Sequence, residues 1–202
     1  MFGLYITHPQ VRIDPDVPVP QWGLSDLGAA RTRTTAQAPW VRRLRRIVSS
    51  DEVKAVETAG ILARAAGVAV EIIEGLYEND RSTTGFMPPP EFEAAADRFF
   101  AAPDQSSRGW ERAVDAQARI VAQVTRVLAD HDPQAPIAFV GHGGVGTLLR
   151  CHMAGRPIAR SQDQPPGGGN LFAFFLADLS LSCDWTAMES WQENATWKPV
   201  TD

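Results

Sequence analysis

The sequence is poor in cysteine and has no long apolar run, and each absence excludes a class of protein. Its 202 residues include two cysteines, Cys151 and Cys183, whose spacing suggests neither a disulfide framework nor a zinc site. No segment approaches the roughly 20 apolar residues of a membrane-spanning helix. The apolar start, Met1–Ile6, is too short for a signal peptide and lacks its basic residues. We therefore expect a cytoplasmic protein with no membrane partner.

Positive charge is also scarce. Lysine and arginine number 19 against 24 aspartates and glutamates, a formal net charge of −5. An acidic chain has no general attraction for nucleic acid. The arginines at 42, 43, 45 and 46 form a basic stretch, but cations at the end of a helix also complement its dipole. We expect no nucleic-acid partner, and any anion site must be built locally from a few donors.

Short apolar runs alternate with helical patterns along the chain, which is typical of a mainly parallel sheet covered by helices. We expect strands over 2–7, 46–49, 68–73, 137–141, 170–176 and 185–191. Ser25 is predicted to cap one helix, and a capping box, Ser49-x-x-Glu52, to open a second that ends at Gly67. Further helices are expected over 91–101, 108–131 and 143–153. The fold class is therefore α/β, a three-layer α/β/α sandwich with one edge strand reversed, in one domain spanning 1–202.

Two histidines lie at predicted strand ends. His8 follows the first strand, and His142 follows the strand that ends at Gly141. In open α/β sheets, ligands bind at the carboxyl ends of strands and near helix N-termini. A neutral imidazole can attack phosphorus to form a phosphohistidine, and a second, protonated imidazole can bind the oxygens on which charge develops. His8 and His142 are therefore candidates for handling a phosphate group.

The order and spacing of several motifs carry a family resemblance. The motifs are Thr7-His8, Leu24-Ser25-x-x-Gly28, Ser49-Ser50-x-x-x-Lys54-Ala55-x-x-Thr58-Ala59, Leu76-x-Glu78 and Gly141-His142-Gly143-Gly144, with Asn170 as weaker support. Together they resemble the histidine phosphatase superfamily, in its phosphoglycerate-mutase-like branch. The resemblance implies a phosphatase that needs no metal or cofactor and hydrolyses a small phosphomonoester. It also implies that His8 is the phosphorylated nucleophile, Glu78 the proton donor and His142 the second pocket histidine.

The phosphate-binding motifs depart from the family pattern. The family's first motif is normally Arg-His-Gly, where this chain has Thr7-His8-Pro9, and Lys54 replaces a second arginine. Threonine offers one neutral hydrogen bond and lysine a point charge, whereas a guanidinium binds phosphate through a charged fork. Arg81, which shares a loop with Glu78, is the first candidate to compensate, and Arg12 is the second. The backbone N–H at Gly143 completes the expected substrate-binding set.

Other functions remain open at this stage. One is a catalytically weak or inactive phosphate-binding protein on the same scaffold, which the threonine at position 7 favours; another is a phosphoglycerate-mutase-type phosphotransferase. Residues 141–146 also match the dinucleotide-binding pattern G-x-G-x-x-G. The nearest suitable acid, Asp163, precedes a Pro-Pro-Gly stretch instead of ending a strand, which disfavours an oxidoreductase. Tryptophans 185, 191 and 197 are expected to cover the last strand and tail, with a homodimer contact as the alternative.

Overall fold

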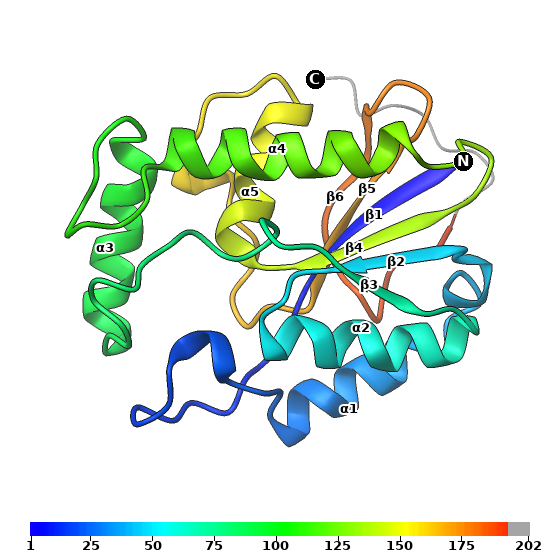
Figure 1. Cartoon of the computed structure of the whole chain (residues 1–202), viewed down its shortest axis with the longest axis horizontal. Helices are drawn as coiled ribbons and strands as arrows, with labels where there is room; N and C mark the ends of the chain where they lie inside the picture. Colours follow the sequence, from blue (N-terminus) through cyan, green and yellow to red (C-terminus); the bar gives the residue numbers. More distant parts are fainter. Residues whose placement is uncertain (194–202) are drawn as a thin grey trace.

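The computed structural model describes residues 1–193, so Trp197 lies outside the described part of the chain. Its centre is a six-stranded sheet with the strand order β3-β2-β4-β1-β5-β6 (Figure 1). The strands are β1 (Phe2–Thr7), β2 (Arg46–Ser49), β3 (Val70–Ile72), β4 (Ile137–Gly141), β5 (Asn170–Phe175) and β6 (Leu181–Ala187). Strands β1, β2 and β4 have the bounds predicted from the sequence.

The sheet is mainly parallel, as predicted. Strands β1 to β4 all run in one direction, whereas β5 is antiparallel to both of its neighbours, β1 and β6. The reversed strand is therefore β5, which lies inside the sheet, and the prediction of a reversed edge strand was wrong. The chain reaches β5 at the carboxyl end of β1, where Gly169 N–H donates to the His8 carbonyl at 3.0 Å. From that point β5 can only run back along β1.

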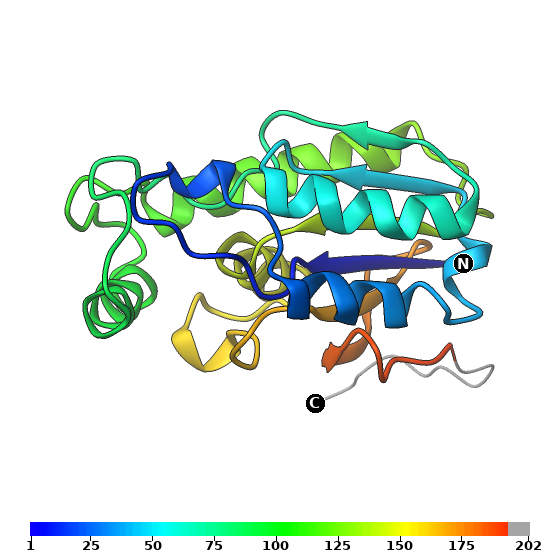
Figure 2. The same cartoon turned by 90° about the horizontal axis from the view of Figure 1, so that it is seen from below.

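Helices cover both faces of the sheet, which confirms the three-layer architecture. They are α1 (Asp26–Thr35), α2 (Val53–Ala66), α3 (Pro89–Ala101), α4 (Ala113–Ala129) and α5 (Gly143–Met153). Figures 1 and 2 show α1 and α2 on one face, α4 and α5 on the other, and α3 beyond the carboxyl end of β1. No described helix is long and apolar enough to cross a membrane.

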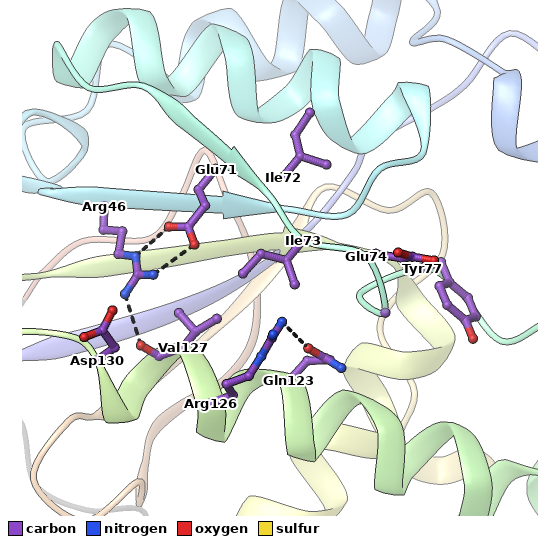
Figure 3. A pocket seen from close by; sticks show the side chains of 11 residues that line it. Arg46, Glu71, Ile72, Ile73, Glu74, Tyr77, Gln123, Arg126, Val127 and Asp130 are labelled. Carbon is purple, nitrogen blue, oxygen red and sulfur yellow. Dashed lines mark hydrogen bonds and ion pairs between the residues drawn. The ribbon is translucent and has the colours of Figure 1, made fainter.

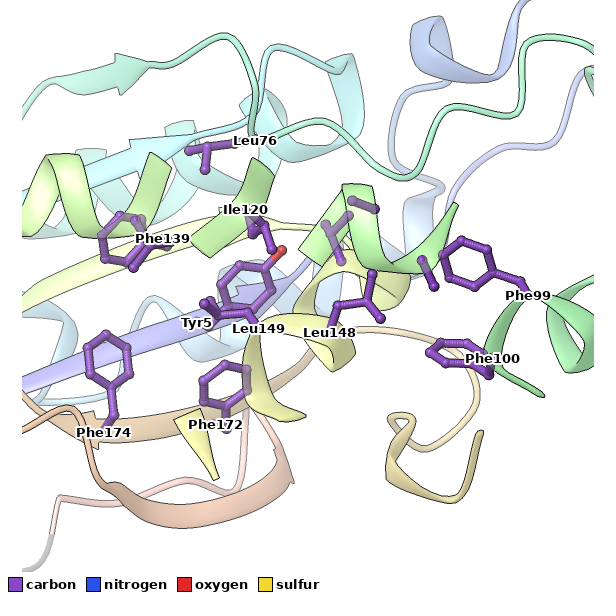
Figure 4. Packing of buried hydrophobic residues seen from close by; sticks show 14 of the residues in the cluster. Tyr5, Leu76, Phe99, Phe100, Ile120, Phe139, Leu148, Leu149, Phe172 and Phe174 are labelled. Carbon is purple, nitrogen blue, oxygen red and sulfur yellow. The ribbon is translucent and has the colours of Figure 1, made fainter. Parts of the chain in front are cut away.

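The core consists of two apolar clusters separated by the sheet. Side chains alternate along β1, so Tyr5 packs with Phe139 and Phe172 on the α4–α5 face (Figure 4), while Leu4 and Ile6 pack on the other. Because β1 is buried on both faces, its sequence is a continuous apolar run. The rigid centre formed in this way carries the two histidines at its carboxyl edge.

Some local signals were interpreted correctly and others were not. Ser25 caps α1, with its Oγ accepting the Gly28 N–H at 3.1 Å, and Gly67 ends α2 with φ +72°. The capping box was wrong: Ser49 belongs to β2, and the side chain of Glu52, the residue before α2, makes no capping hydrogen bond. β6 begins earlier than predicted because a tight turn, with Leu179 at φ +60°, follows β5 directly.

Candidate active site

The topology brings the two histidines together. Strands β1 and β4 are neighbours, and Thr7 pairs with Gly141, so the residue after each strand lies at the same edge. The backbone N–H of His8 donates to the Gly141 carbonyl at 2.9 Å. The imidazole centroids of His8 and His142 are 5.3 Å apart, with an angle of 69° between the rings. Both rings can therefore contact one phosphate-sized group.

His8 is held in one tautomer. Its Nδ1 lies 2.8 Å from the Pro9 carbonyl oxygen. Since that oxygen can only accept, Nδ1 carries the hydrogen and Nε2 keeps its lone pair. Burial, and next the neighbouring His142, lower the pKa of His8 to about 3. A neutral imidazole with a free Nε2 lone pair is the form that can act as a nucleophile.

His142 is fully buried just before α5. Its Nε2 lies 2.8 Å from Ser50 Oγ and 3.4 Å from Glu52 Oε1. Burial lowers the pKa of His142, an effect opposed by the carboxylates of Glu52 and Glu78. Within residues 1–193, His142 Nδ1 has no hydrogen-bond partner. A buried polar atom without a partner is costly, so a bound ligand is its natural partner.

Glu52 and Lys54 form a buried ion pair beside His142. Lys54 is 3% exposed, and its ammonium pairs with Glu52 Oε2 and donates to the Val19 carbonyl at 2.9 Å. Burial acts to raise the pKa of Glu52, but the charges of His142 and Lys54 hold it at about 2. Glu52 and Val19 therefore take two of the three hydrogens of the Lys54 ammonium. Glu52 was missed as a site residue because it was assigned to a helix cap, and the nearby Lys54 was the only signal.

The carboxylate of Glu78 lies at the N-terminus of α5. Its Oε2 accepts the Gly144 N–H at 3.0 Å, and its Oε1 accepts those of Val145 and Asn79 at 2.9 and 3.0 Å. A Cβ on Gly144 would fall 2.6 Å from Oε1, so this close approach requires glycine. Glu78 thus bonds to Gly144, two residues after His142, and its Oε2 retains one lone pair for a proton.

An arginine on α4 positions the Glu78 loop. The guanidinium of Arg119 donates to the carbonyls of Gly75 and Tyr77 at 2.8 and 2.9 Å, and it stacks 3.6 Å from the centroid of the Tyr77 ring. An ion pair with Glu111, at 2.7 Å, fixes the guanidinium. Arg119 was also missed, because an arginine in a helical pattern carries no sign of which distant carbonyls it binds.

The two candidate replacement arginines lie in different places. The guanidinium of Arg81 stacks 4.8 Å from the Phe92 ring centroid and 6.0 Å from that of Trp110. It lines the same cavity as Glu78. Arg12 is exposed on the loop before α1, where its backbone N–H bonds the Gly23 carbonyl. The structure therefore brings Arg81, and not Arg12, to the wall of the site.

The remaining predicted residues face a glutamine. Thr7 is fully buried, and its hydroxyl donates to Gln164 Oε1 at 2.7 Å and accepts the Asn170 N–H at 3.0 Å. Gly143 is the first residue of α5, and a Cβ there would fall 2.2 Å from Gln164 Nε2. Gln164 therefore lies between the two strand ends that carry the histidines. Nothing in the sequence pattern marked it.

A cavity of about 470 Å³ lies beside this cluster, bounded by the carboxylates that flank His142. It is lined by Pro18, Val19, Pro20, Asp51, Glu52, Tyr77, Glu78, Asn79, Asp80, Arg81, Ser82 and Gly85. The loop before α1 and the loop after Glu78 meet where the rings of Trp22 and Phe86 pack at a tilt of 58°, with centroids 5.6 Å apart. The cavity is large enough to receive a group attached to the phosphate.

A larger groove, of about 710 Å³, lies between β3 and α4 (Figure 3). One arginine that lines it is engaged by the protein: Arg46 makes two bonds to the Glu71 carboxylate and one to the Val127 carbonyl. Neither the histidines nor the two carboxylates that flank His142, Glu52 and Glu78, line it. Across the described residues, no group of three or more His, Cys, Asp and Glu side chains is arranged to hold a metal ion. The histidine pair is therefore the candidate site.

The glycine-rich turn after β4 serves close packing. A Cβ on Gly141 would fall 2.4 Å from the Tyr5 hydroxyl oxygen, and one on Gly146 would fall 2.4 Å from the Tyr5 ring. The same hydroxyl accepts the His142 N–H at 3.1 Å. These glycines make room for Tyr5, which holds the backbone of the second histidine, so their spacing does not require a dinucleotide.

The sequence matches the family model of the histidine phosphatase superfamily (branch 1) over residues 10–170. The chain belongs to this superfamily. Among curated proteins, none matches the sequence. As predicted, the superfamily's phosphoglycerate-mutase-like fold is found here.

Solved structures with this fold cover most of the chain. Mycobacterial glucosyl-3-phosphoglycerate phosphatase in complex with inorganic phosphate has a TM-score of 0.76 and 21% identity, covering 93% of this chain and 98% of its own. The phosphoserine phosphatase of Entamoeba histolytica, in complex with 3-phosphoglyceric acid, has a TM-score of 0.74, 17% identity and the same coverages. YhfR of Bacillus stearothermophilus has a TM-score of 0.71 and 20% identity, covering 85% and 89%. At these identities the likeness establishes a shared fold.

Proposed function

We propose that this protein is a metal-independent phosphatase that hydrolyses a small phosphomonoester through a phosphohistidine at His8. The observation that carries the proposal is the state of the histidine pair. The two rings are 5.3 Å apart, and the Pro9 carbonyl holds His8 in the tautomer that leaves Nε2 free. A pair arranged in this way supplies both a nucleophile and a partner for the phosphoryl oxygens.

The proposed reaction has two steps. First, His8 Nε2 attacks phosphorus, the bond from phosphorus to the ester oxygen breaks, and Glu78 Oε2 gives its proton to the leaving alkoxide. Glu78 is then a carboxylate that takes a proton from water as the water oxygen attacks the phosphohistidine. The bond from phosphorus to nitrogen breaks, inorganic phosphate leaves, and both side chains return to their starting states.

His142 is proposed to bind a phosphoryl oxygen through Nδ1, its unpartnered nitrogen. The negative charge that develops on that oxygen favours a proton on the imidazole. Glu52 Oε1, 3.4 Å from Nε2, would stabilise the resulting imidazolium. In this scheme Lys54 acts through Glu52, by keeping that buried carboxylate compensated, and not by direct contact with phosphate.

The adjoining cavity supports a small phosphorylated metabolite as substrate. Its volume, about 470 Å³, is at the lower end of the range for small-molecule sites. Prolines and Tyr77 give it an apolar wall, and Arg81 lines the same space. Solved structures with this fold are named as phosphatases of glucosyl-3-phosphoglycerate and of phosphoserine, both small phosphomonoesters. The cytoplasmic location and the homodimer remain predictions.

The test is a hydrolysis screen over many phosphomonoesters, run beside a His8→Asn variant. We expect the wild type to release phosphate from at least one compound, and a rapid alkaline quench to show one added phosphoryl group on His8. The variant should lose at least about 1000-fold in kcat/KM, as enzymes do when a nucleophile is removed. Saturable phosphate binding without any turnover would favour the phosphate-binding alternative. Transfer to an alcohol in place of water would favour the phosphotransferase.

A further inference from the structure

The pocket lacks an arginine before its first histidine, and another donor lies at that place. In the proposed reaction the phosphoryl oxygens need donors, because an unpaired anion in a partly buried site is strongly disfavoured. Thr7 cannot supply its hydrogen, since its hydroxyl already faces two protein acceptors, Gln164 Oε1 at 2.7 Å and the Asn170 carbonyl at 3.1 Å. The amide of Gln164 extends from this hydroxyl to the start of α5.

The orientation of the Gln164 amide follows from its neighbours. Asn170 Nδ2 lies 3.0 Å from the Pro165 carbonyl, which can only accept, so this atom is a nitrogen. The same nitrogen lies 3.1 Å from Gln164 Oε1, which must then be the acceptor. The Thr7 hydroxyl is nearer to this oxygen, at 2.7 Å, than to its other acceptor, the Asn170 carbonyl at 3.1 Å. Nε2 of Gln164, with its two hydrogens, therefore faces away from Thr7 and Asn170.

Gln164 Nε2 lies over the first residue of α5. A Cβ on Gly143 would fall 2.2 Å from this nitrogen, so a side chain there would displace the amide. Gly143 directly follows His142, whose Nδ1 is also unpartnered. None of the described residues accepts a hydrogen bond from Gln164 Nε2. Two polar nitrogens without protein partners thus lie at the start of α5, one on His142 and one over Gly143.

The segment that carries Gln164 is fixed in advance of any ligand. The backbone N–H of Gln164 donates to Asp163 Oδ1 at 2.8 Å, and Thr147 of α5 donates to the same oxygen at 2.9 Å. Further along the loop, the Gly169 N–H holds the His8 carbonyl. A donor fixed in this way costs little to order when a ligand binds, which is what an effective oxyanion site requires.

We infer that Gln164 binds a phosphoryl oxygen through Nε2, in the place that the missing arginine leaves, and that Thr7 is a positioning residue for its amide. The inference rests on the proposed function, because it concerns the same site. A neutral amide pays less to leave water than a guanidinium does, and its hydrogen bond to a charged oxygen is worth about 10- to 100-fold in affinity.

The experiment measures binding of inorganic phosphate and of orthovanadate to the full-length chain by calorimetry. Gln164→Met keeps the length of the side chain but removes the donor, and it should weaken binding about 10-fold or more. Gln164→Glu places a negative charge there, and we expect a loss of about 100-fold or more. Gln162→Glu is the matched control on the same segment, because its Oε1 accepts from Arg150 and Arg156. Its affinity should stay within about twofold of the wild type.

The positioning role of Thr7 has its own test. Thr7→Val removes the hydroxyl that orients the amide, and it should weaken phosphate binding nearly as much as Gln164→Met does. Thr7→Ser keeps the hydroxyl and should restore the affinity. Adding Gln164→Met to Thr7→Val should cause little further loss, because both changes remove one interaction.

The outcomes separate this inference from the proposed function. If the wild type hydrolyses phosphomonoesters while both Gln164 variants bind phosphate and orthovanadate normally, the inference is overturned and the phosphatase stands. A lower melting temperature with an unchanged dissociation constant would likewise show that Gln164 only anchors its loop. If the wild type binds neither anion and hydrolyses nothing, the proposed function fails and this inference fails with it.

Discussion

The two histidines lie in contrasting halves of one site. The His8 half consists of Thr7, His8, Gln164 and Asn170, and the hydroxyl and amide groups of Thr7, Gln164 and Asn170 are joined by hydrogen bonds. The His142 half consists of Glu52, Lys54, Glu78 and His142, and it contains two carboxylates and a buried ammonium. A buried charge is tolerated only beside its partner, so changes in the His142 half should affect stability and proton transfer. Changes in the neutral half should mainly affect ligand binding.

The largest effect is expected from Glu52→Gln, which leaves the buried Lys54 ammonium without a counter-charge. Removing one partner of a buried ion pair costs about 3–5 kcal/mol. The free energy of unfolding, measured by denaturant titration, should fall by an amount in this range.

The double variant Glu52→Gln/Lys54→Met is the control for charge, since it removes both partners together. It should be more stable than Glu52→Gln alone. If the double variant loses at least as much stability, packing and not charge compensation governs this half, and the contrast between the halves is lost.

Glu78→Gln tests proton transfer in the same half. The amide keeps an acceptor for α5 but cannot give a proton to a leaving alkoxide, so kcat/KM on alkyl phosphates should fall about 100-fold or more. Aryl phosphates, whose leaving groups need little protonation, should be hydrolysed at nearly the wild-type rate. An equal loss on both substrate types would show that the carboxylate acts only through its bonds to Gly144 and Val145.

A smaller effect is expected from Arg81→Ala. Its guanidinium lies over Phe92 and Trp110 at the cavity wall, and we expect it to bind the part of the substrate that occupies the cavity. We expect kcat/KM to fall about 10-fold, mostly through KM. Arg12→Ala, at an exposed loop position, should be unchanged within about twofold. Equal losses of kcat/KM in both variants would indicate that the positive charge of the protein acts at long range, and that Arg81 makes no specific contact with the substrate.

The sequence was sufficient to predict the central strands of the sheet and the proximity of the two histidines. Strands β1 and β4 are short, fully buried apolar runs, and the rule that parallel strands end at one edge then brings His8 and His142 together. β6 was misplaced because its residues are mostly half-buried, with only Leu181 buried, so the apolar signal that marks a strand is weak there.

The residues that support the site could not be predicted from the sequence, because their hydrogen-bond partners lie far away along the chain. The hydrogen bond between Thr7 and Gln164 joins residues 157 positions apart, and the one between Arg119 and Gly75 joins residues 44 positions apart. Such contacts depend on the path of the loops, which local propensity does not determine. The prediction for Glu52 failed for a different reason. Ser49-x-x-Glu52 fits a capping box, but β2 continues through Ser49. The Glu52 carboxylate instead pairs with Lys54 and lies beside His142.

The smallest predicted effect concerns the acid side of stability. Burial lowers the pKa of both histidines below the unfolded value of about 6.5, to about 3 for His8. As the pH falls below 6.5, the unfolded chain takes up protons that the folded chain does not, so the folded state loses stability. Each such histidine contributes a slope of at most about 1.4 kcal/mol per pH unit. In the window from pH 6.5 to 5 the low pKa of Glu52 adds little, because its effect, of the same sign, appears only near and below pH 4.5. Burial raises the pKa of Asp163, which gives an effect of the opposite sign, so the histidine effect is assigned by comparing variants.

The histidine slope can be assigned with two variants measured over that window. His8→Gln removes one titrating ring, so its free energy of unfolding should fall less steeply with decreasing pH than that of the wild type. His152→Gln is the matched control, since His152 is exposed near the end of α5, and its slope should equal that of the wild type. If His8→Gln keeps the wild-type slope, His8 gains a proton in the folded protein as readily as in the unfolded chain. The His8 ring would then be protonated at mildly acidic pH, and it would have to lose that proton when the substrate binds before it could attack phosphorus.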